Sequence, residues 1–238
     1  MITSEIHLDS VESTMATAKG LAAGQDFLLA WADAQTHGKG TRGRPWQSLM
    51  GNAYMTIGIH RRHLSRERLA LLPLEMGLHV WEECAARVSP AHRKDLTLKW
   101  PNDLLLGGGK TAGILMESHG DFMLVGIGVN VAGSPPVADG GTPSACLADA
   151  GMPVEGKDPL VQGIYRRIRE APGGDGDGYS PETVLLQWQG KVDWNRAHRL
   201  RDRAGTPIVL PLSVNRHGHL QVQHADGSRE WLVADYLS

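Results

Sequence analysis

Three runs of strand-forming residues follow one another between residues 96 and 131, and only short turns separate them. The runs cover residues 96–106, 110–118 and 122–131, and the first turn consists of Gly107, Gly108 and Gly109. Connections this short join antiparallel neighbours, because a parallel pair needs a crossover of a dozen or more residues. The stretch therefore predicts a meander within an antiparallel or mixed sheet, and it argues against the strand–helix alternation of a Rossmann fold.

The rest of the chain supplies further strands and the helices that cover the sheet. Apolar patterns predict strands at 2–8, 27–34 and 52–60, helices at 13–23, 64–88, 160–170 and 181–190, and a shorter helix at 144–150. Asp9 or Ser10 is expected to cap the first helix. The glycine-rich acidic segment at 171–180 predicts a disordered insert rather than a calcium site, because it lacks the EF-hand pattern.

Short alternating segments after residue 206 predict a separate small β unit at the end of the chain. The expected fold class is therefore α+β, with a mixed or antiparallel sheet flanked by helices. We expect the first domain to span residues 1–191 and the small C-terminal β domain to span residues 192–238.

Composition excludes several classes of partner. The chain has 238 residues and a formal net charge of −2, so no bulk field attracts it to nucleic acid or to an anionic membrane. No apolar run approaches the ~20 residues that a membrane-spanning helix needs, and the N-terminus lacks the features of a signal peptide. Cys84 and Cys146 show no sign of pairing, which is typical of a reducing compartment and predicts a cytoplasmic protein.

A glycine-rich basic stretch, QTHGKGTRGRPW, runs from Gln35 to Trp46. Its glycines permit close backbone approach and expose N–H groups, and they alternate with Lys39, Arg42 and Arg44. Ammonium and guanidinium groups in such a loop suit phosphate or carboxylate ligands. The stretch by itself is equally compatible with a solvated basic turn.

A second candidate site surrounds Lys110, which follows Gly109 on a tight turn that can aim its ammonium group. The sequence GGGKT resembles a nucleotide P-loop, but that pattern requires glycine where Leu104 stands and a helix where a strand is predicted. Just before it, KWPND places Asn102 and Asp103 after a proline. Their hard oxygen atoms suit Mg²⁺, so we predict Asp103 as a magnesium ligand, with a purely structural turn as the alternative.

Four motifs together carry a family resemblance: GKGTRGRPW, KWPND, KTAGI and GIGVN, in that order. The sequence resembles the biotin protein ligases, whose patterns read approximately GRGRxGRxW, KWPND, KxAGI and GIGxN. The resemblance covers nearly the whole chain and implies a ligase that uses biotin, ATP and Mg²⁺. It implies formation of biotinoyl-adenylate and transfer of biotin to a lysine of the biotin carboxyl carrier domain of a carboxylase.

The same resemblance implies an SH3-like barrel at the C-terminus and a possible homodimer. Some family members carry an N-terminal DNA-binding domain of about 60 residues, whereas this chain begins almost at the catalytic domain. We therefore expect a monofunctional enzyme without a repressor role and without nucleic acid or membrane as a partner.

The family's site residues map onto matching positions of this sequence. The resemblance implies that Lys110 and Arg44 are catalytic. It implies biotin contacts from Ser13, Thr14, Gln35, Gly38, Lys39, Arg42, Lys110 and Gly113. It implies nucleotide contacts from Arg42, Arg44, Trp46, Lys99, Asn102 and Asn130.

Lys39 and Thr41 stand where the family usually has arginine, and Met15 replaces a common asparagine. The missing arginine leaves two alternatives open: the adenylate leaks from the site, or Arg42, Arg44 or Lys39 compensates. Two other functions are also possible. One is a lipoate–protein ligase, which shares the fold, and the other is a catalytically weak protein that binds biotin or its adenylate.

Overall fold

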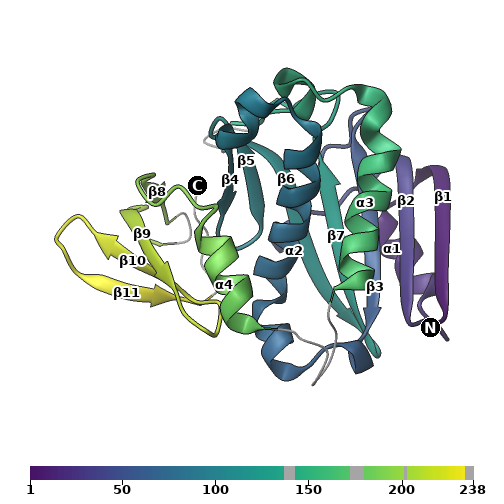
Figure 1. The fold of residues 1–238 in the computed structure, drawn as a ribbon, viewed down its shortest axis with the longest axis horizontal. Helices are drawn as coiled ribbons and strands as arrows, with labels where there is room; N and C mark the ends of the chain where they lie inside the picture. Colours follow the sequence, from purple (N-terminus) through teal and green to yellow (C-terminus); the bar gives the residue numbers. More distant parts are fainter. Residues whose placement is uncertain (137–142, 172–179, 201–202, 234–238) are drawn as a thin grey trace.

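The computed structural model describes residues 1–136, 143–171, 180–200 and 203–233. A mixed seven-stranded sheet runs through the molecule in the order β1-β2-β3-β7-β6-β5-β4 (Figure 1). Its strands are β1 (Thr3–Val11), β2 (Phe27–Gln35), β3 (Ala53–His60), β4 (Leu96–Lys99), β5 (Asp103–Leu106), β6 (Gly109–His119) and β7 (Phe122–Val129). The pair β1–β2 is parallel and the other neighbouring pairs are antiparallel.

Helices cover both faces of this sheet because successive side chains of β2 point to opposite sides. Leu28 and Ala30 pack with Met15 of α1 (Thr14–Leu21). Phe27 and Leu29 belong to the larger core beneath the other helices. These helices are α2 (Arg66–Arg87), α3 (Lys157–Glu170) and α4 (Pro181–Gln189) (Figure 1). Short 3₁₀ segments lie at Thr41–Gly43, Arg61–His63, Pro90–Asp95, Leu147–Ala150 and Val154–Gly156.

The prediction of a single strand at 96–106 is wrong, because this segment forms two strands, β4 and β5. β4 and β5 form an antiparallel hairpin in which Lys99 faces Asp103, and the chain turns through Trp100, Pro101 and Asn102. Proline has no N–H to donate to a sheet, so it fits a turn between strands. Because apolar residues lie on both sides of that turn, the sequence pattern of the two strands resembles that of one continuous strand.

Two smaller predictions also differ from the structure, and a third lies mostly outside the described residues. The N-terminal cap of α1 is Ser13, whose Oγ accepts a hydrogen bond from the Ala16 amide at 3.1 Å. The predicted caps, Asp9 and Ser10, are wrong because both residues belong to β1. The short helix predicted at 144–150 is a 3₁₀ turn at Leu147–Ala150. The disordered insert was predicted for a segment of which residues 172–179 lie outside the described residues.

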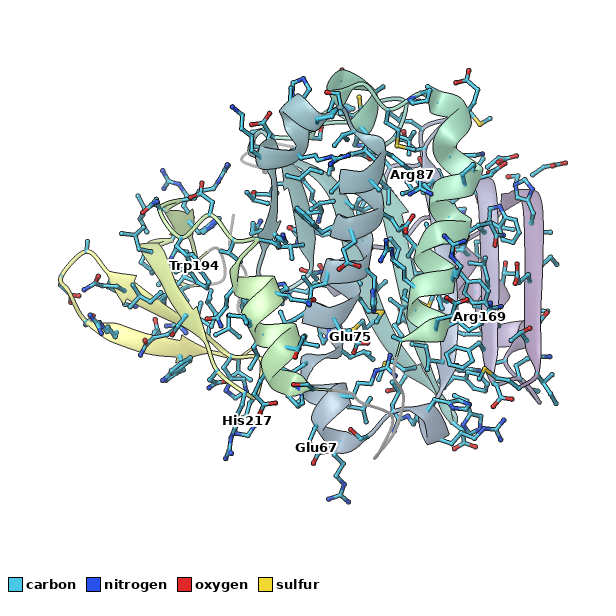
Figure 2. All side chains as sticks on the ribbon, viewed as in Figure 1. Glu67, Glu75, Arg87, Arg169, Trp194 and His217 are labelled. Atoms are coloured by element: carbon cyan, nitrogen blue, oxygen red, sulfur yellow. The ribbon has the colours of Figure 1, made fainter. Side chains whose placement is uncertain are left out.

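A second, antiparallel sheet follows α4. It contains β8 (His198–Arg199), β9 (Ile208–Val214), β10 (Leu220–His224) and β11 (Arg229–Leu232) in the order β11-β10-β9-β8. Trp194 joins it to the larger unit, since its ring meets Trp188 of α4 edge-to-face at 6.4 Å (Figure 2). The Trp100 indole also donates to the Gly218 carbonyl at 2.8 Å. The expected fold class is therefore confirmed: a mixed sheet flanked by helices, with a small β unit at the C-terminus.

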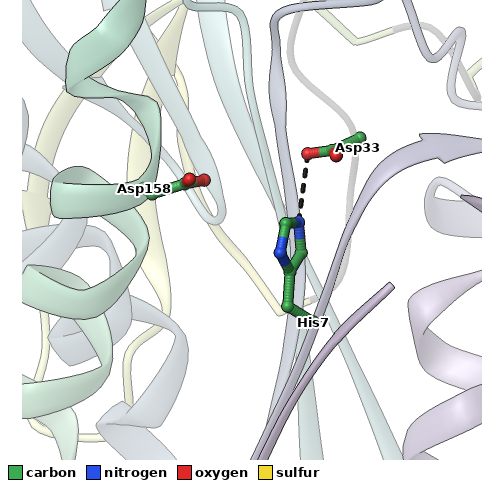
Figure 3. Close-up of side chains that lie close together, drawn as sticks. All are labelled: His7, Asp33 and Asp158. Atoms are coloured by element: carbon green, nitrogen blue, oxygen red, sulfur yellow. Dashed lines mark hydrogen bonds and ion pairs between the residues drawn. The ribbon is translucent and has the colours of Figure 1, made fainter. Parts of the chain in front are cut away.

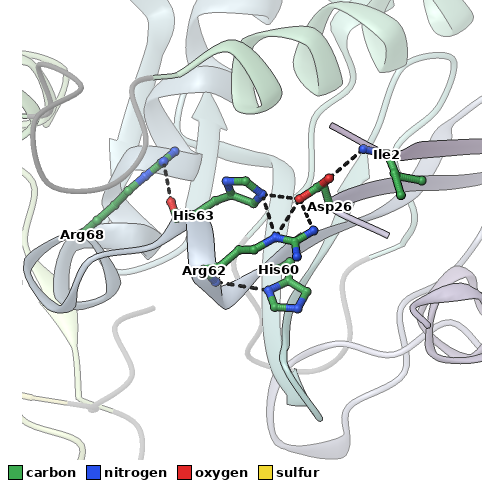
Figure 4. Close-up of polar contacts among 6 residues, drawn as sticks. All are labelled: Ile2, Asp26, His60, Arg62, His63 and Arg68. Atoms are coloured by element: carbon green, nitrogen blue, oxygen red, sulfur yellow. Dashed lines mark hydrogen bonds and ion pairs between the residues drawn. The ribbon is translucent and has the colours of Figure 1, made fainter. Parts of the chain in front are cut away.

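Asp26 ties the start of β1 to the segment that follows β3 (Figure 4). Its carboxylate accepts from the Ile2 amide at 2.6 Å and from Arg62 Nε at 2.8 Å, and it lies 2.6 Å from His63 Nε2. The hydrogen bonds from His63, Ile2 and Arg62 hold the pKa of Asp26 well below its ordinary value.

Asp26→Asn should therefore lower the melting temperature near neutral pH. Because the folded-state pKa is depressed, the stabilisation is complete above the ordinary aspartate pKa of about 3.9 and disappears as the pH falls toward the folded-state value. Thermal melts of wild type and variant should converge in acid. The exposed Asp9→Asn is the control and should leave the melts unchanged. A gap that persists undiminished in acid would contradict this role.

Candidate active site

A cavity opens on the α1 side of the sheet, between the start of α1, the basic loop and the strands β6 and β7; its empty space, open solvent included, is about 490 Å³. Residues from five separate segments line it: Ser13, Met15, Gln35, Lys39, Gly40, Thr41, Trp46, Asn102, Lys110, Gly113, Ile114, Leu115, Gly126, Ile127 and Gly128. All four motifs of the sequence therefore meet at one place. Polar and cationic groups stand at its rim, and a sheet surface forms its floor.

The floor is flat because glycines face each other across the two strands. Gly113 of β6 is paired with Gly128 of β7, and Gly126 lies two residues earlier on the same face. The indole of Trp46 rests on this surface. A Cβ atom at Gly128 would lie 2.5 Å from Trp46 Cε2, and one at Gly113 would lie 2.8 Å from Trp46 Cζ3. The absence of these two side chains thus creates the room that the indole occupies.

Gly128→Ala should displace Trp46 and loosen the loop that carries it. An added methyl group at 2.5–2.8 Å from the rigid indole forces a shift. We expect trypsin to cut faster at Lys39 and Arg42, and biotin to bind about 10-fold more weakly, roughly the cost of one badly packed contact. Gly20→Ala is a matched control, since nothing lies within 4 Å of its added Cβ. Unchanged cleavage and affinity in Gly128→Ala would disprove this packing role.

The basic loop is folded as a small hairpin in this structure. The Trp46 amide donates to the Gly38 carbonyl at 2.8 Å, and the Gly40 amide donates to the Arg44 carbonyl at 2.7 Å. Arg42 occupies the left-handed region at φ 60°, which allows the tight turn. Lys39 lines the cavity, whereas Arg42 and Arg44 are exposed on the outer turn. The loop is therefore a closed structure at the cavity rather than an extended basic turn.

A polar wall lies at the α1 end of the cavity. Ser13 and Thr14 are both buried at the start of α1. The Gln35 carbonyl oxygen accepts from the Thr14 amide at 2.9 Å and from the Thr14 hydroxyl at 3.2 Å. Ser13 and Gln35 face the cavity, while Thr14 stands behind Gln35. This wall offers hydrogen bonds in fixed directions to a polar ligand group.

The cationic rim depends on a buried carboxylate. Asp103 Oδ1 lies 2.6 Å from Lys110 Nζ, and Asp103 Oδ2 lies 3.1 Å from Lys99 Nζ. Burial by itself would raise the pKa of Asp103, but the two ammonium groups hold it below its ordinary value. The carboxylate is therefore ionised and holds the Lys110 ammonium in place, 5.5 Å from the centre of the Trp46 ring.

This arrangement argues against Asp103 as a magnesium ligand. Each of its oxygens already bonds a lysine, and two ammonium groups beside it repel a divalent cation. No carboxylate is among the described side chains that line the cavity. These residues do not fit a magnesium ion held by the protein, so Mg²⁺ is expected to arrive on the phosphates of a nucleotide.

The backbone of Lys110 is held as firmly as its side chain. Its amide donates to the Pro143 carbonyl at 2.6 Å. The side-chain amide of Asn130 donates to the carbonyls of Lys110 and Ala145, each at 3.2 Å. The Asn130 Oδ1 atom is buried without a hydrogen-bond partner in the described structure. Asn130 thus positions Lys110 and does not line the cavity itself.

The predicted site residues divide into two groups. Seven line the cavity: Ser13, Gln35, Lys39, Trp46, Asn102, Lys110 and Gly113. The others stand behind these or on the outer loop: Thr14, Gly38, Arg42, Arg44, Lys99, Asp103 and Asn130. The sequence reasoning missed the floor residues Leu115, Gly126, Ile127 and Gly128. Two glycines spaced two apart in a predicted strand were the available signal, because they remove side chains from one face.

A separate cluster of possible metal ligands lies between β1, β2 and α3 (Figure 3). His7, Asp33 and Asp158 each place one ligand atom within 4.8 Å of the others. Lys157 forms an ion pair with Asp33 and lies 3.7 Å from Asp158, and His7 stacks on Trp31. Lys157 thus already offsets part of the negative charge of the cluster, and we assign no metal to it.

Comparison with known proteins decides the family. The model of the biotin/lipoate A/B protein ligase family matches residues 8–132, which is more than half of the chain. The chain belongs to this family. Within it, the chain is 33% identical to the biotin–[acetyl-CoA-carboxylase] ligase of Paracoccus denitrificans over 223 residues, covering 85% of this chain and 82% of that protein. The ligase of the same name from Mycobacterium tuberculosis is 31% identical over 76% of this chain and 65% of its own length.

Solved structures of the biotin/lipoate A/B protein ligase family share the fold. The biotin protein ligase from Leishmania major, solved in complex with biotinyl-5-AMP, matches with a TM-score of 0.71 and 29% identity. The match covers 97% of this chain and 99% of that chain, so it includes most of the C-terminal sheet. The expected resemblance to the biotin protein ligases is confirmed, and the C-terminal sheet agrees with the expected SH3-like unit.

Proposed function

We propose that this chain is a biotin–protein ligase that uses ATP to attach biotin to a lysine of a biotin carboxyl carrier domain. In the first step, a biotin carboxylate oxygen attacks the α-phosphorus of ATP, and pyrophosphate leaves. In the second step, the lysine amine attacks the acyl carbon of biotinoyl-adenylate. AMP leaves, the amine loses a proton, and an amide bond remains.

The observation that carries this proposal is the meeting of the family motifs around one cavity. Lys110 holds a point charge at the rim, where a carboxylate and a phosphate would both approach. A cation between two anions reduces their repulsion and stabilises the charge that develops in the transition state. Lys39 adds a second cation at the same rim. Arg42 and Arg44 act in this proposal from the outer loop.

The Trp46 indole and the hairpin together would shield the reactive adenylate. Trp46 lies over the glycine floor, and its indole nitrogen is buried. A mixed anhydride reacts with water, so a cavity closed on this side favours transfer to the acceptor over hydrolysis.

The polar wall favours biotin over lipoate as the acid. Ser13 and Gln35 present hydrogen-bonding groups to the cavity, where the ureido ring of biotin would find partners, and Thr14 supports Gln35 from behind. The disulfide ring of lipoate has no comparable donors or acceptors. A site built for hydrogen bonds rejects an analogue that lacks them, because its own polar groups are then left unpaired.

The direct test is transfer to a carrier domain. The protein is incubated with Mg·ATP, a biotin carboxyl carrier domain and either biotin or lipoate, and the product is read by streptavidin blot and intact mass. A carrier domain with its acceptor lysine replaced by arginine is the control. We expect biotin to label the native carrier far more strongly than the control carrier, and lipoate to label neither. Lipoate transfer would establish the alternative ligase, and biotin binding without transfer would establish a weak binding protein.

We also propose that the enzyme acts in a reducing compartment such as the cytoplasm, on a carrier domain as its macromolecular substrate. The two cysteines, Cys84 and Cys146, are buried free thiols, which supports this location. In the described part of the chain, no helix combines the length and the apolar character needed to cross a membrane.

A further inference from the structure

We propose that Ser48 is a positioning residue that fixes the side-chain amide of Gln35 and joins it to the base of the basic hairpin. The inference rests on the proposed function, because it concerns the end of the cavity that would hold biotin. Ser48 does not line the cavity, and it belongs to none of the four motifs.

The orientation of the Gln35 amide follows from its neighbours. The backbone N–H of Thr14 can only donate, so the group 2.9 Å from it is the Gln35 carbonyl oxygen. The amide nitrogen of Gln35 must then face the other way, where it donates to Ser48 Oγ at 3.2 Å. Thr14 and Ser48 thus hold the two ends of one amide group.

The orientation of the Gln35 amide also determines the donors and acceptors in the neighbouring hydrogen bonds. The Thr14 hydroxyl donates to Gln35 Oε1 at 3.2 Å, so the buried Thr56 hydroxyl, 2.9 Å from it, is the donor in their contact. Ser48 accepts from Gln35 and donates to the Trp46 carbonyl at 3.4 Å. A directed chain therefore runs from the sheet at Thr56, through Gln35, to the hairpin at Trp46.

Close packing at Gly38 supports the same connection. A Cβ atom there would lie 2.6 Å from the Trp46 carbonyl oxygen, 3.0 Å from Ser48 Oγ and 3.1 Å from Gln35 Nε2. The hairpin base, the serine and the amide therefore meet with no space for a side chain. Gly38 is required here for close approach, since it is not among the residues with positive φ.

Loss of Ser48 Oγ would act on both partners. One N–H of Gln35 is used by Ser48, and the second remains for a ligand in the cavity, which Gln35 lines. Without the serine oxygen the amide can rotate away from the direction that a ligand requires. The Trp46 carbonyl loses its partner at the same time, so the hairpin base should open more often.

The experiment compares Ser48→Ala with Ser48→Thr, which keeps the hydroxyl. Biotin affinity is measured by calorimetry, and kcat and KM are measured as biotin-dependent exchange of labelled pyrophosphate into ATP. We expect Ser48→Ala to raise the Kd and KM for biotin about 3- to 10-fold, the loss of one neutral hydrogen bond, with kcat changed less than about 2-fold. Ser48→Thr should restore binding. Trypsin should cut Ser48→Ala faster at Lys39 and Arg42 at an unchanged melting temperature.

A double-mutant cycle tests whether Ser48 acts through Gln35. On a Gln35→Met background, Ser48→Ala should have no further effect on biotin affinity. An equal loss on both backgrounds would overturn the positioning role, as would a wild-type Kd in Ser48→Ala. If the wild-type protein itself fails to bind biotin, the proposed function falls. Wild-type binding with an unaffected Ser48→Ala refutes the Ser48 inference alone.

Discussion

Lys110→Ala is expected to slow biotin-dependent pyrophosphate exchange about 30- to 1000-fold, which corresponds to roughly 2–4 kcal/mol of transition-state stabilisation. The Lys110 ammonium lines the cavity, and Asp103 holds it there at 2.6 Å. Asn130 fixes the backbone carbonyl of the same residue. Because the charge is already in place before substrates bind, its removal should appear mainly in the chemical step.

The matched control is Lys99→Ala. Lys99 contacts the same buried carboxylate at 3.1 Å, but it is not among the residues that line the cavity. Both substitutions leave Asp103 with one ammonium partner fewer, so both should lower the melting temperature. Exchange should fall far more in Lys110→Ala. Equal losses of rate in the two variants would assign the effect to stability and remove Lys110 from the mechanism.

Thr41→Arg is expected to reduce the labelling of bystander proteins about 10- to 100-fold. Thr41 lines the cavity at the start of the outer turn, where the family pattern usually has arginine. A hydrogen bond to a charged group is worth ~1.5–3 kcal/mol, and threonine lacks the reach of a guanidinium group. The wild-type enzyme should therefore release biotinoyl-adenylate into solution, where it acylates nearby lysines.

The assay mixes each variant with biotin, Mg·ATP and albumin, and it reads albumin labelling by streptavidin blot. Gln47→Arg is the control, because it adds the same charge at an exposed loop position outside the cavity. It should leave labelling unchanged. Low labelling by wild type that Thr41→Arg does not alter would show that a neighbouring cation, such as Lys39 at the cavity rim, already compensates.

Much of the fold could be predicted because hydrophobic periodicity indicates which segments form strands and which form helices. The alternation in β3 and β7 and the helical spacing in α2 appear in the sequence near their observed bounds. The β4–β5 hairpin was missed because leucines lie on both sides of its turn, and periodicity alone does not detect a reversal of chain direction. Pro101 and Asn102 were the local signals for that turn.

The site could be predicted as a set of residues but not as an arrangement. The sequence analysis named Lys110, Asp103 and Asn130 without revealing that Asp103 and Asn130 hold Lys110. Such relations depend on which strands become neighbours, and a single sequence does not specify them. For the same reason Ser48 carried no signal, since its partners Gln35 and Trp46 meet only when the hairpin folds.

The central claim is that this protein activates biotin with ATP, and the exchange of labelled pyrophosphate into ATP by the purified protein measures that step directly. The exchange requires no carrier domain, so it reports the first reaction alone. We predict label in ATP when biotin and Mg²⁺ are present, and none when biotin is omitted or replaced by lipoate. Exchange that is supported by lipoate, or that is absent with biotin despite measurable biotin binding, would contradict it.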